Sequence, residues 1–171
     1  MTGTRTATAI DVLQREVPAL MYSRYRFLET CIPASWLAVL VLTRCGIGAR
    51  MHLVNVETRN TNRDTVKDAG HVVVILDDAT GLDLSLGQYA RFGLDLPATW
   101  TFPARQLLEP PWVRTEYLDQ GKVVYLCGPE QRLAEFLASR GDLTPEEVSW
   151  MMPRPDDIDR LTTMIDREVD R

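Results

Sequence analysis

The sequence contains little lysine, histidine or cysteine, and it has no long apolar run. Of 171 residues, two are lysine, two are histidine and three are cysteine. Three cysteines cannot all pair, which argues against a disulfide scaffold. The most apolar stretch, residues 32–42, is far shorter than the roughly 20 residues that cross a bilayer. Residues 1–10 lack the basic and apolar regions of a secretory signal. The sequence therefore predicts a cytoplasmic protein without a membrane span.

Clusters of basic residues are also missing. Nineteen lysines and arginines stand against 24 aspartates and glutamates, a net charge of −5, and no run gathers five or six cations. This balance argues against a nucleic-acid partner, which would need arginines such as Arg24 and Arg26 to assemble on one surface. The hydrophobic fraction of 45% and charged fraction of 25% are those of an ordinary globular protein. The length predicts one domain, with a core over residues 9–92 and a C-terminal extension over 93–171 packed on it.

The spacing of apolar residues predicts two helices near the N-terminus. The first covers residues 9–20, after ten residues expected to fray, and the second runs from Cys31 to Arg44 and is mostly buried. Thr30 is placed to cap the second helix, Pro33 fits its first turn, and Gly46 marks its end. Strands are then predicted over 49–57, 71–76 and 82–86, with a polar loop over 58–69 and a turn over 77–81.

The second half of the chain is rich in turn signals. Four prolines between residues 97 and 111 predict an irregular crossing, and residues 113–117 and 123–127 flank a turn that predicts a hairpin. Helices are expected over 128–138, after the capping box at 144–147, and over 156–169, where the acidic residues form a solvated face. Helices followed by strands and further helices indicate an α+β fold.

Three residues stand where their side chains can do chemistry. Cys31 begins the buried helix, where unpaired N–H groups and the helix dipole stabilise a thiolate. A thiolate needs a base, and His71 opens a buried strand. Asp83 lies on the returning strand, where it can orient an imidazole, although the expected register leaves it a few residues from His71 unless a bulge intervenes.

The other cysteines are expected to be packing thiols. Cys45 ends the same helix about 21 Å from Cys31, too far for a disulfide, and Cys127 lies on a later strand. A zinc site needs three or four ligands, and no close-spaced pair of histidines or cysteines is present. The sequence thus predicts no metal and no cofactor.

One combination of segments is recognisable: the run Cys31-Ile-Pro-Ala-Ser35, the apolar helix, Gly46-Ile-Gly-Ala-Arg50 and the following strand. Together with His71 and the later Asp83-Leu-Ser-Leu-Gly-Gln-Tyr89, it resembles the core of the transglutaminase-like superfamily of papain-like cysteine proteins. It is similar above all to small bacterial members such as lasso-peptide leader peptidases. The resemblance covers residues 28–90, about half the chain.

This resemblance implies a papain-like fold in which Cys31 is the nucleophile, His71 the general base and acid, and Asp83 the orienting group. Valines follow His71 where the family usually has an aromatic residue, and no oxyanion side chain is evident. Gln14, Ser35 and Gln88 are the candidates for positioning a substrate or its oxyanion, beside the amides at the helix start.

The implied activity is thiol-dependent acyl chemistry on a peptide or protein substrate. Hydrolysis, as in a cysteine peptidase or amidase, is the first interpretation, and transfer to an amine or deamidation of glutamine would use the same residues. The alternative from another class is a binding or assembly protein that keeps this fold without catalysis.

Overall fold

A computed structural model describes residues 2–25, 30–59, 65–94, 96–105, 113–116, 123–127 and 149–171. The α+β class predicted from the sequence is confirmed. The elements, in chain order, are α1 (Thr2–Tyr25), α2 (Cys31–Arg44), β1 (Ala49–Arg59), β2 (Thr65–Leu76), β3 (Thr80–Asp83), the 3-10 helix η1 (Leu86–Phe92), β4 (Trp100–Pro103), β5 (Val113–Glu116), β6 (Val123–Cys127) and α5 (Pro155–Val169).

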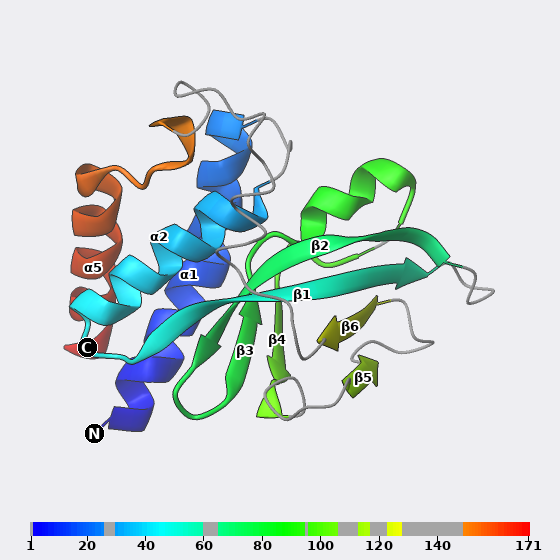
Figure 1. Cartoon of the computed structure of the whole chain (residues 1–171). Helices are drawn as coiled ribbons and strands as arrows, with labels where there is room; N and C mark the ends of the chain where they lie inside the picture. Colours follow the sequence, from blue (N-terminus) through cyan, green and yellow to red (C-terminus); the bar gives the residue numbers. More distant parts are fainter. Residues whose placement is uncertain are drawn as a thin grey trace.

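The strands form one antiparallel sheet in the order β4-β3-β2-β1-β6-β5. The long β1–β2 hairpin is its centre, and α1, α2 and α5 gather at one side of it (Figure 1). Strands β4, β5 and β6 come from the C-terminal part of the chain, and they extend the sheet at both edges. Within the described ranges, no helix combines the length and apolar character needed to cross a bilayer.

The sheet buries apolar side chains on both faces because successive residues of a strand point in opposite directions. Val74 and Leu76 of β2 pack with the three helices, whereas Val73 and Ile75 pack on the other face with Phe102 and other residues. Residues 71–76 are all buried, as predicted from their uninterrupted apolar character. This double burial fixes the register of β2 and hence the direction in which His71 points.

Helix α2 has the predicted bounds, and its end follows from the sequence. Gly46 adopts a left-handed backbone (φ 75°), its N–H donates to the Thr43 carbonyl, and the Ile47 N–H donates to the Leu42 carbonyl. This is a Schellman motif, in which glycine avoids the strain of a Cβ at positive φ. The predicted cap at the other end is wrong: Thr30 has helical backbone angles, and its side chain makes no capping hydrogen bond within the described part of the chain. A capping side chain needs an extended backbone.

Two predictions in the first half of the chain are wrong because tertiary contacts order polar segments. Residues 2–10 are helical rather than frayed, and Arg5 donates to the Cys45 carbonyl and pairs with Asp166. The polar loop predicted over 58–69 is largely strand, since β1 ends at Arg59 and β2 begins at Thr65. Cross-strand pairing continues through this polar part of the hairpin to Thr58 and Lys67.

Three further predictions need correction. The strand predicted over 82–86 ends at Asp83, and η1 begins at Leu86. The irregular crossing over 97–111 contains β4, whose residues pair with β3. The acidic face of α5 is not simply solvated, because its carboxylates meet arginines of the other helices in the pairs Arg5–Asp166, Arg15–Glu168, Arg24–Asp157 and Arg44–Asp159.

The predicted hairpin is present as β5 and β6, although its turn and the two helices expected over 128–138 and after residue 144 lie outside the described residues. The last helix begins at Pro155, one residue before the predicted start.

Gly81 of β3 is a position where a side chain would collide with a neighbour. A Cβ there would lie 2.2 Å from Cε2 of Phe102, whose buried ring stacks on Tyr125 at 4.6 Å between centroids. We expect Gly81→Ala to lower the free energy of unfolding by about 1–3 kcal/mol, because overpacking displaces a ring with no room to move. Urea unfolding measures the change.

Gly48→Ala is the matched control for that substitution. A Cβ at Gly48 would meet the Asp77 carboxylate, which is exposed and can rotate away. An equal loss of stability in the two variants would show that the Phe102–Tyr125 stack is not the cause.

Candidate active site

The pairing of β2 with β3 brings His71 and Asp83 together. Val74 lies opposite Leu82 and Ile75 opposite Gly81, so the same register places Asp83 opposite Val73. Asp83 is then on the same face as His71, displaced by two residues, and diagonal neighbours lie within reach of long side chains. His71 Nε2 lies 2.8 Å from Asp83 Oδ2. The bulge considered from the sequence is therefore unnecessary.

Asp83 is fully buried, and four hydrogen bonds surround its carboxylate. Oδ2 accepts from His71 Nε2 and, at 2.8 Å, from the Tyr125 hydroxyl. Oδ1 accepts from the Ser85 backbone N–H at 2.9 Å and from the Ser85 hydroxyl at 3.2 Å. Burial alone would raise the pKa of Asp83, but the charge of His71 and these hydrogen bonds hold the pKa below its ordinary value. Asp83 thus stays ionised and orients the imidazole.

The other ring nitrogen of His71 is the one available for proton transfer. Nδ1 lies 3.0 Å from Nε2 of Gln88 and 3.2 Å from the Tyr89 hydroxyl, and the ring also hydrogen-bonds to Cys31. Burial would lower the pKa of His71, but the charge of Asp83 and the hydrogen bonds to Asp83 and Cys31 raise it to about 10. The ring is therefore protonated at neutral pH, beside the thiol.

Tyr89 differs from His71 because its hydroxyl does not titrate in the ordinary range. Burial, together with the charges of Cys31 and Asp83, raises the pKa of Tyr89 far above its usual value. The Tyr89 and His71 rings are tilted against each other with centroids 5.5 Å apart. Tyr89 therefore supplies a neutral hydroxyl at Nδ1 and one wall of the imidazole site.

Cys31 reaches His71 because α2 begins beside the open edge of β2. In the described part of the chain, β3 pairs with β2 only at Val74 and Ile75. Closer to His71, the edge of β2 is contacted by α2 instead: the Ser35 hydroxyl donates to the Val72 carbonyl at 3.0 Å. Cys31, one turn before Ser35, packs in a buried cluster that includes Val72. The helix start is thus anchored to the strand residue next to His71.

Ser35 is a positioning residue, and its hydroxyl is buried. We expect Ser35→Ala to lower the free energy of unfolding by about 1–3 kcal/mol, since the variant leaves a buried carbonyl without its donor. Urea unfolding tests this, with Ser23→Ala as the control. The Ser23 hydroxyl bonds to the Leu20 carbonyl in an exposed position, where water replaces it. A Ser35→Ala variant as stable as Ser23→Ala would contradict the anchoring role.

The structure brings together Cys31, His71, Asp83 and Gln88, but it places Gln14 elsewhere. The Gln14 amide donates to the Thr101 hydroxyl at 3.0 Å in an exposed position on the sheet edge. The Gln14 side chain is thus engaged by Thr101 of β4, and within the described part of the chain it makes no hydrogen bond to Cys31 or His71.

Sequence reasoning missed Tyr125 and gave Tyr89 no role. Tyr125 carries no motif: it is one aromatic residue in the run 123–127, and only the pairing of β6 with β1 brings it beneath Asp83. The position of Tyr89 directly after Gln88 in the Asp83–Tyr89 motif is a usable signal. Polar aromatic residues that are fully buried generally have a hydrogen-bond partner, so Tyr125 is a positioning residue for Asp83.

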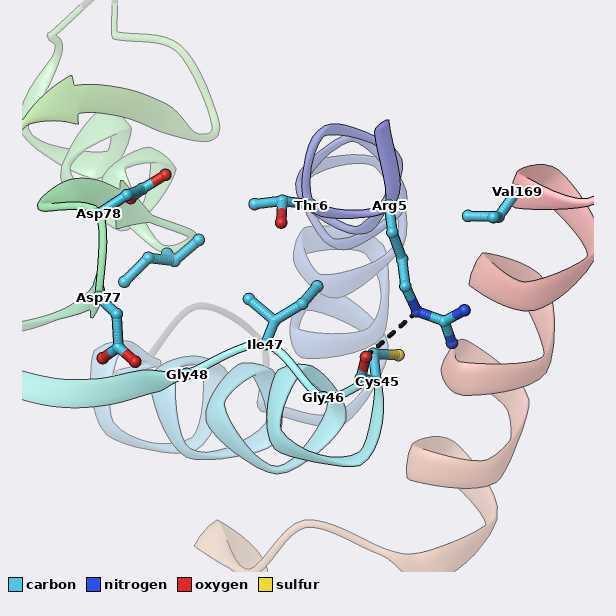
Figure 2. A pocket seen from close by; sticks show the side chains of 10 residues that line it. Arg5, Thr6, Cys45, Gly46, Ile47, Gly48, Asp77, Asp78 and Val169 are labelled. Atoms are coloured by element: carbon cyan, nitrogen blue, oxygen red, sulfur yellow. Dashed lines mark hydrogen bonds between the residues drawn. The ribbon is translucent and has the colours of Figure 1, made fainter. Parts of the chain in front are cut away.

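One cavity lies at the end of α2 opposite to Cys31. Its volume is about 480 Å³, and Arg5, Cys45, Ile47 and Asp77 are among its lining residues. Figure 2 shows Cys45 at the end of α2, with Arg5 donating to its carbonyl. The helix separates this hollow from Cys31 by its full 14 residues, about 21 Å. Burial raises the pKa of the Cys45 thiol.

Two further observations bear on the site. Among the described residues, no group of three or more His, Cys, Asp or Glu side chains is arranged to hold a metal ion. No family model, curated protein or solved structure matches this chain. The interpretation of the site therefore depends on its geometry.

Proposed function

We propose that this protein performs thiol-dependent acyl chemistry on a peptide or amide substrate, with hydrolysis as the overall reaction. The observation that carries the proposal is the buried pair of His71 and Asp83, joined at 2.8 Å, with Cys31 close enough to the imidazole to raise its pKa. A nucleophile, a base and a group that orients the base, in this order of contact, are the elements of a catalytic triad. The resemblance of residues 28–90 to transglutaminase-like and papain-like cysteine proteins agrees with these roles.

The proposed reaction uses Nδ1 of His71 for every proton transfer. The Cys31 thiolate attacks the amide carbonyl carbon, and the carbonyl π electrons move to oxygen. The tetrahedral intermediate collapses as the C–N bond breaks, and the leaving amine takes the proton from Nδ1. Water then attacks the thioester and gives a proton to Nδ1, and cleavage of the S–C bond restores the thiolate. Nε2 keeps its bond to Asp83 throughout.

The oxyanion has donors at the start of α2. The Ala34 N–H already donates to the Thr30 carbonyl, and Pro33 has no N–H. The amides of Cys31 and Ile32 belong to the helix end that lacks intrahelical acceptors, and the helix dipole adds to their positive potential. These two amides are the proposed oxyanion hole. An amine in place of water would give transfer, and a glutamine side chain as substrate would give deamidation.

One observation favours the alternative of a non-catalytic binding protein with the same core. His71 and Asp83 have no exposed surface, and the exposed fraction of Cys31 is 5%. A buried ion pair can also fix a unique core arrangement. The two functions differ in whether a small acyl donor reaches Cys31.

The test uses p-nitrophenyl acetate, which is small enough for a nearly closed site and needs no knowledge of the natural substrate. We expect a burst of one p-nitrophenolate per chain and one acetyl group on Cys31, located by peptide mass spectrometry. Cys31→Ser and His71→Gln should lose the burst, whereas Cys45→Ser should keep it. Acetylation spread evenly over the cysteines, or a burst that survives Cys31→Ser, would overturn the proposal.

A further inference from the structure

A second, small cavity adjoins the candidate active site. Its volume is about 40 Å³, and Thr30, Ser85 and Gln88 are among its lining residues. Each of these three is directly linked to the triad: Thr30 precedes Cys31, Ser85 donates to Asp83, and Gln88 contacts Nδ1 of His71. The cavity therefore lies among residues that adjoin the thiol and the imidazole, although Cys31 and His71 are not themselves among its lining residues.

The size of the cavity limits what it can hold. A single water molecule needs about 10–15 Å³ of cavity volume, so this cavity admits roughly three water-sized groups. A side chain of one to three non-hydrogen atoms fits, whereas that of leucine, phenylalanine or arginine does not. The volume of the cavity therefore predicts that it discriminates strongly between side chains by their size.

The chemistry of the walls favours an uncharged group. Pro18 and Met21 of α1, Leu84 and Ala98 supply apolar surface, and none of the described lining residues carries a charge. Moving a charged side chain into an apolar space without a partner is strongly unfavourable, so the pocket should reject acidic and basic residues.

We propose that this cavity is the specificity pocket for the acyl residue, the residue whose carbonyl Cys31 attacks, and that it selects a small uncharged side chain such as alanine. The inference rests on the proposed function, because it assigns the cavity to the substrate of that same thiol. Thr30 and Gln88 line the cavity and adjoin Cys31 and Nδ1 of His71, respectively. In this assignment, the side chain on the Cα next to the attacked carbonyl occupies the cavity.

The test compares the p-nitrophenyl esters of N-acetylglycine, N-acetylalanine, N-acetylleucine and N-acetylphenylalanine on the full chain. The leaving group is the same in all four, so rate differences report the acyl side. We expect the glycine and alanine esters to acylate Cys31 at least tenfold faster than the leucine and phenylalanine esters. Acylation rates within threefold of one another would overturn the pocket assignment.

Ala98→Leu is the variant that fills the cavity from an exposed position. It should slow acylation by the alanine ester at least tenfold more than acylation by the glycine ester, which carries no side chain. Ala90→Leu, on the exposed surface of η1 and outside the cavity lining, is the matched control and should alter none of the rates. Circular dichroism checks that both variants fold.

The outcomes separate this inference from the proposed function. Acetylation of Cys31 without size discrimination, or equal slowing of all esters by Ala98→Leu, would overturn the pocket alone. Failure of p-nitrophenyl acetate to acylate Cys31 would overturn the proposed function and the pocket with it.

Discussion

Asp83→Ala should lower the free energy of unfolding by about 3–5 kcal/mol, the largest effect of any single substitution considered for this protein. The carboxylate is fully buried and accepts from His71, Tyr125 and Ser85. Removing one member of a buried ion pair leaves the other charge without compensation, which costs far more than losing an exposed pair. Urea or thermal unfolding of the variant, followed by far-UV circular dichroism, measures the loss.

Two comparisons make the Asp83 result specific. Asp11→Ala removes an exposed aspartate from α1 and should change the free energy of unfolding by less than about 0.5 kcal/mol. Asp83→Asn keeps the shape but not the charge, so it should fall between the wild type and Asp83→Ala. If Asp83→Ala were as stable as Asp11→Ala, the hydrogen-bond network around Asp83 would not exist in solution.

The second large effect is a loss of stability at alkaline pH that depends on His71. The pKa of His71 is about 10 in the folded protein, against 6.5 for an ordinary histidine. The folded state binds this proton more tightly than the unfolded state, so the stabilisation is complete below pH 6.5 and is lost as the pH rises to about 10. The free energy of unfolding should therefore fall by several kcal/mol across this window, as measured by urea unfolding at each pH.

The two histidines provide the control for this pH dependence. The decline between pH 6.5 and 10 should persist in His52→Gln and disappear in His71→Gln. At acid pH the stability depends on pH in the opposite direction because of Asp83. The pKa of Asp83 is lowered in the folded protein, so its contribution to the free energy of unfolding is complete above pH ~3.9 and is lost as the pH falls further. A wild-type profile that is flat up to pH 10 would contradict the His71–Asp83 ion pair.

The sequence was sufficient for the elements whose signals are local. Helix α2 is a long apolar run that ends before a glycine with positive φ, and residues 71–76, the predicted part of β2, are an apolar run too short for a buried helix. Cys31 was identified from its residue type and its place at the start of α2, and His71 from its residue type and its place at the start of the apolar run. The sequence order Cys-His-Asp led us to expect that the two residues lie close together. In the structure, the Ser35 hydroxyl joins α2 to the edge of β2 beside His71.

The parts that the sequence did not reveal depend on contacts between distant segments. Arg5 stabilises the helical start of α1 by binding two residues that lie 40 and 161 positions away in the sequence. Strand β4 was hidden among prolines because an edge strand tolerates them where a central strand does not. Tyr125 joins the site only through the pairing of β6 with β1, and no local pattern of residues encodes that pairing.

The most direct test of the account is the alkylation of Cys31 by iodoacetamide in the native protein at pH 6.5. Cys45 is an internal control, because the exposed fractions of Cys31 and Cys45 are 5% and 8% and access does not favour Cys31. If His71 activates the thiol, peptide mass spectrometry will show Cys31 reacting at least tenfold faster than Cys45 in the wild type, and His71→Gln will remove the difference. If instead Cys31 reacts no faster than Cys45, or keeps its advantage in His71→Gln, the Cys31–His71–Asp83 chain is a structural feature of the core and not an active site.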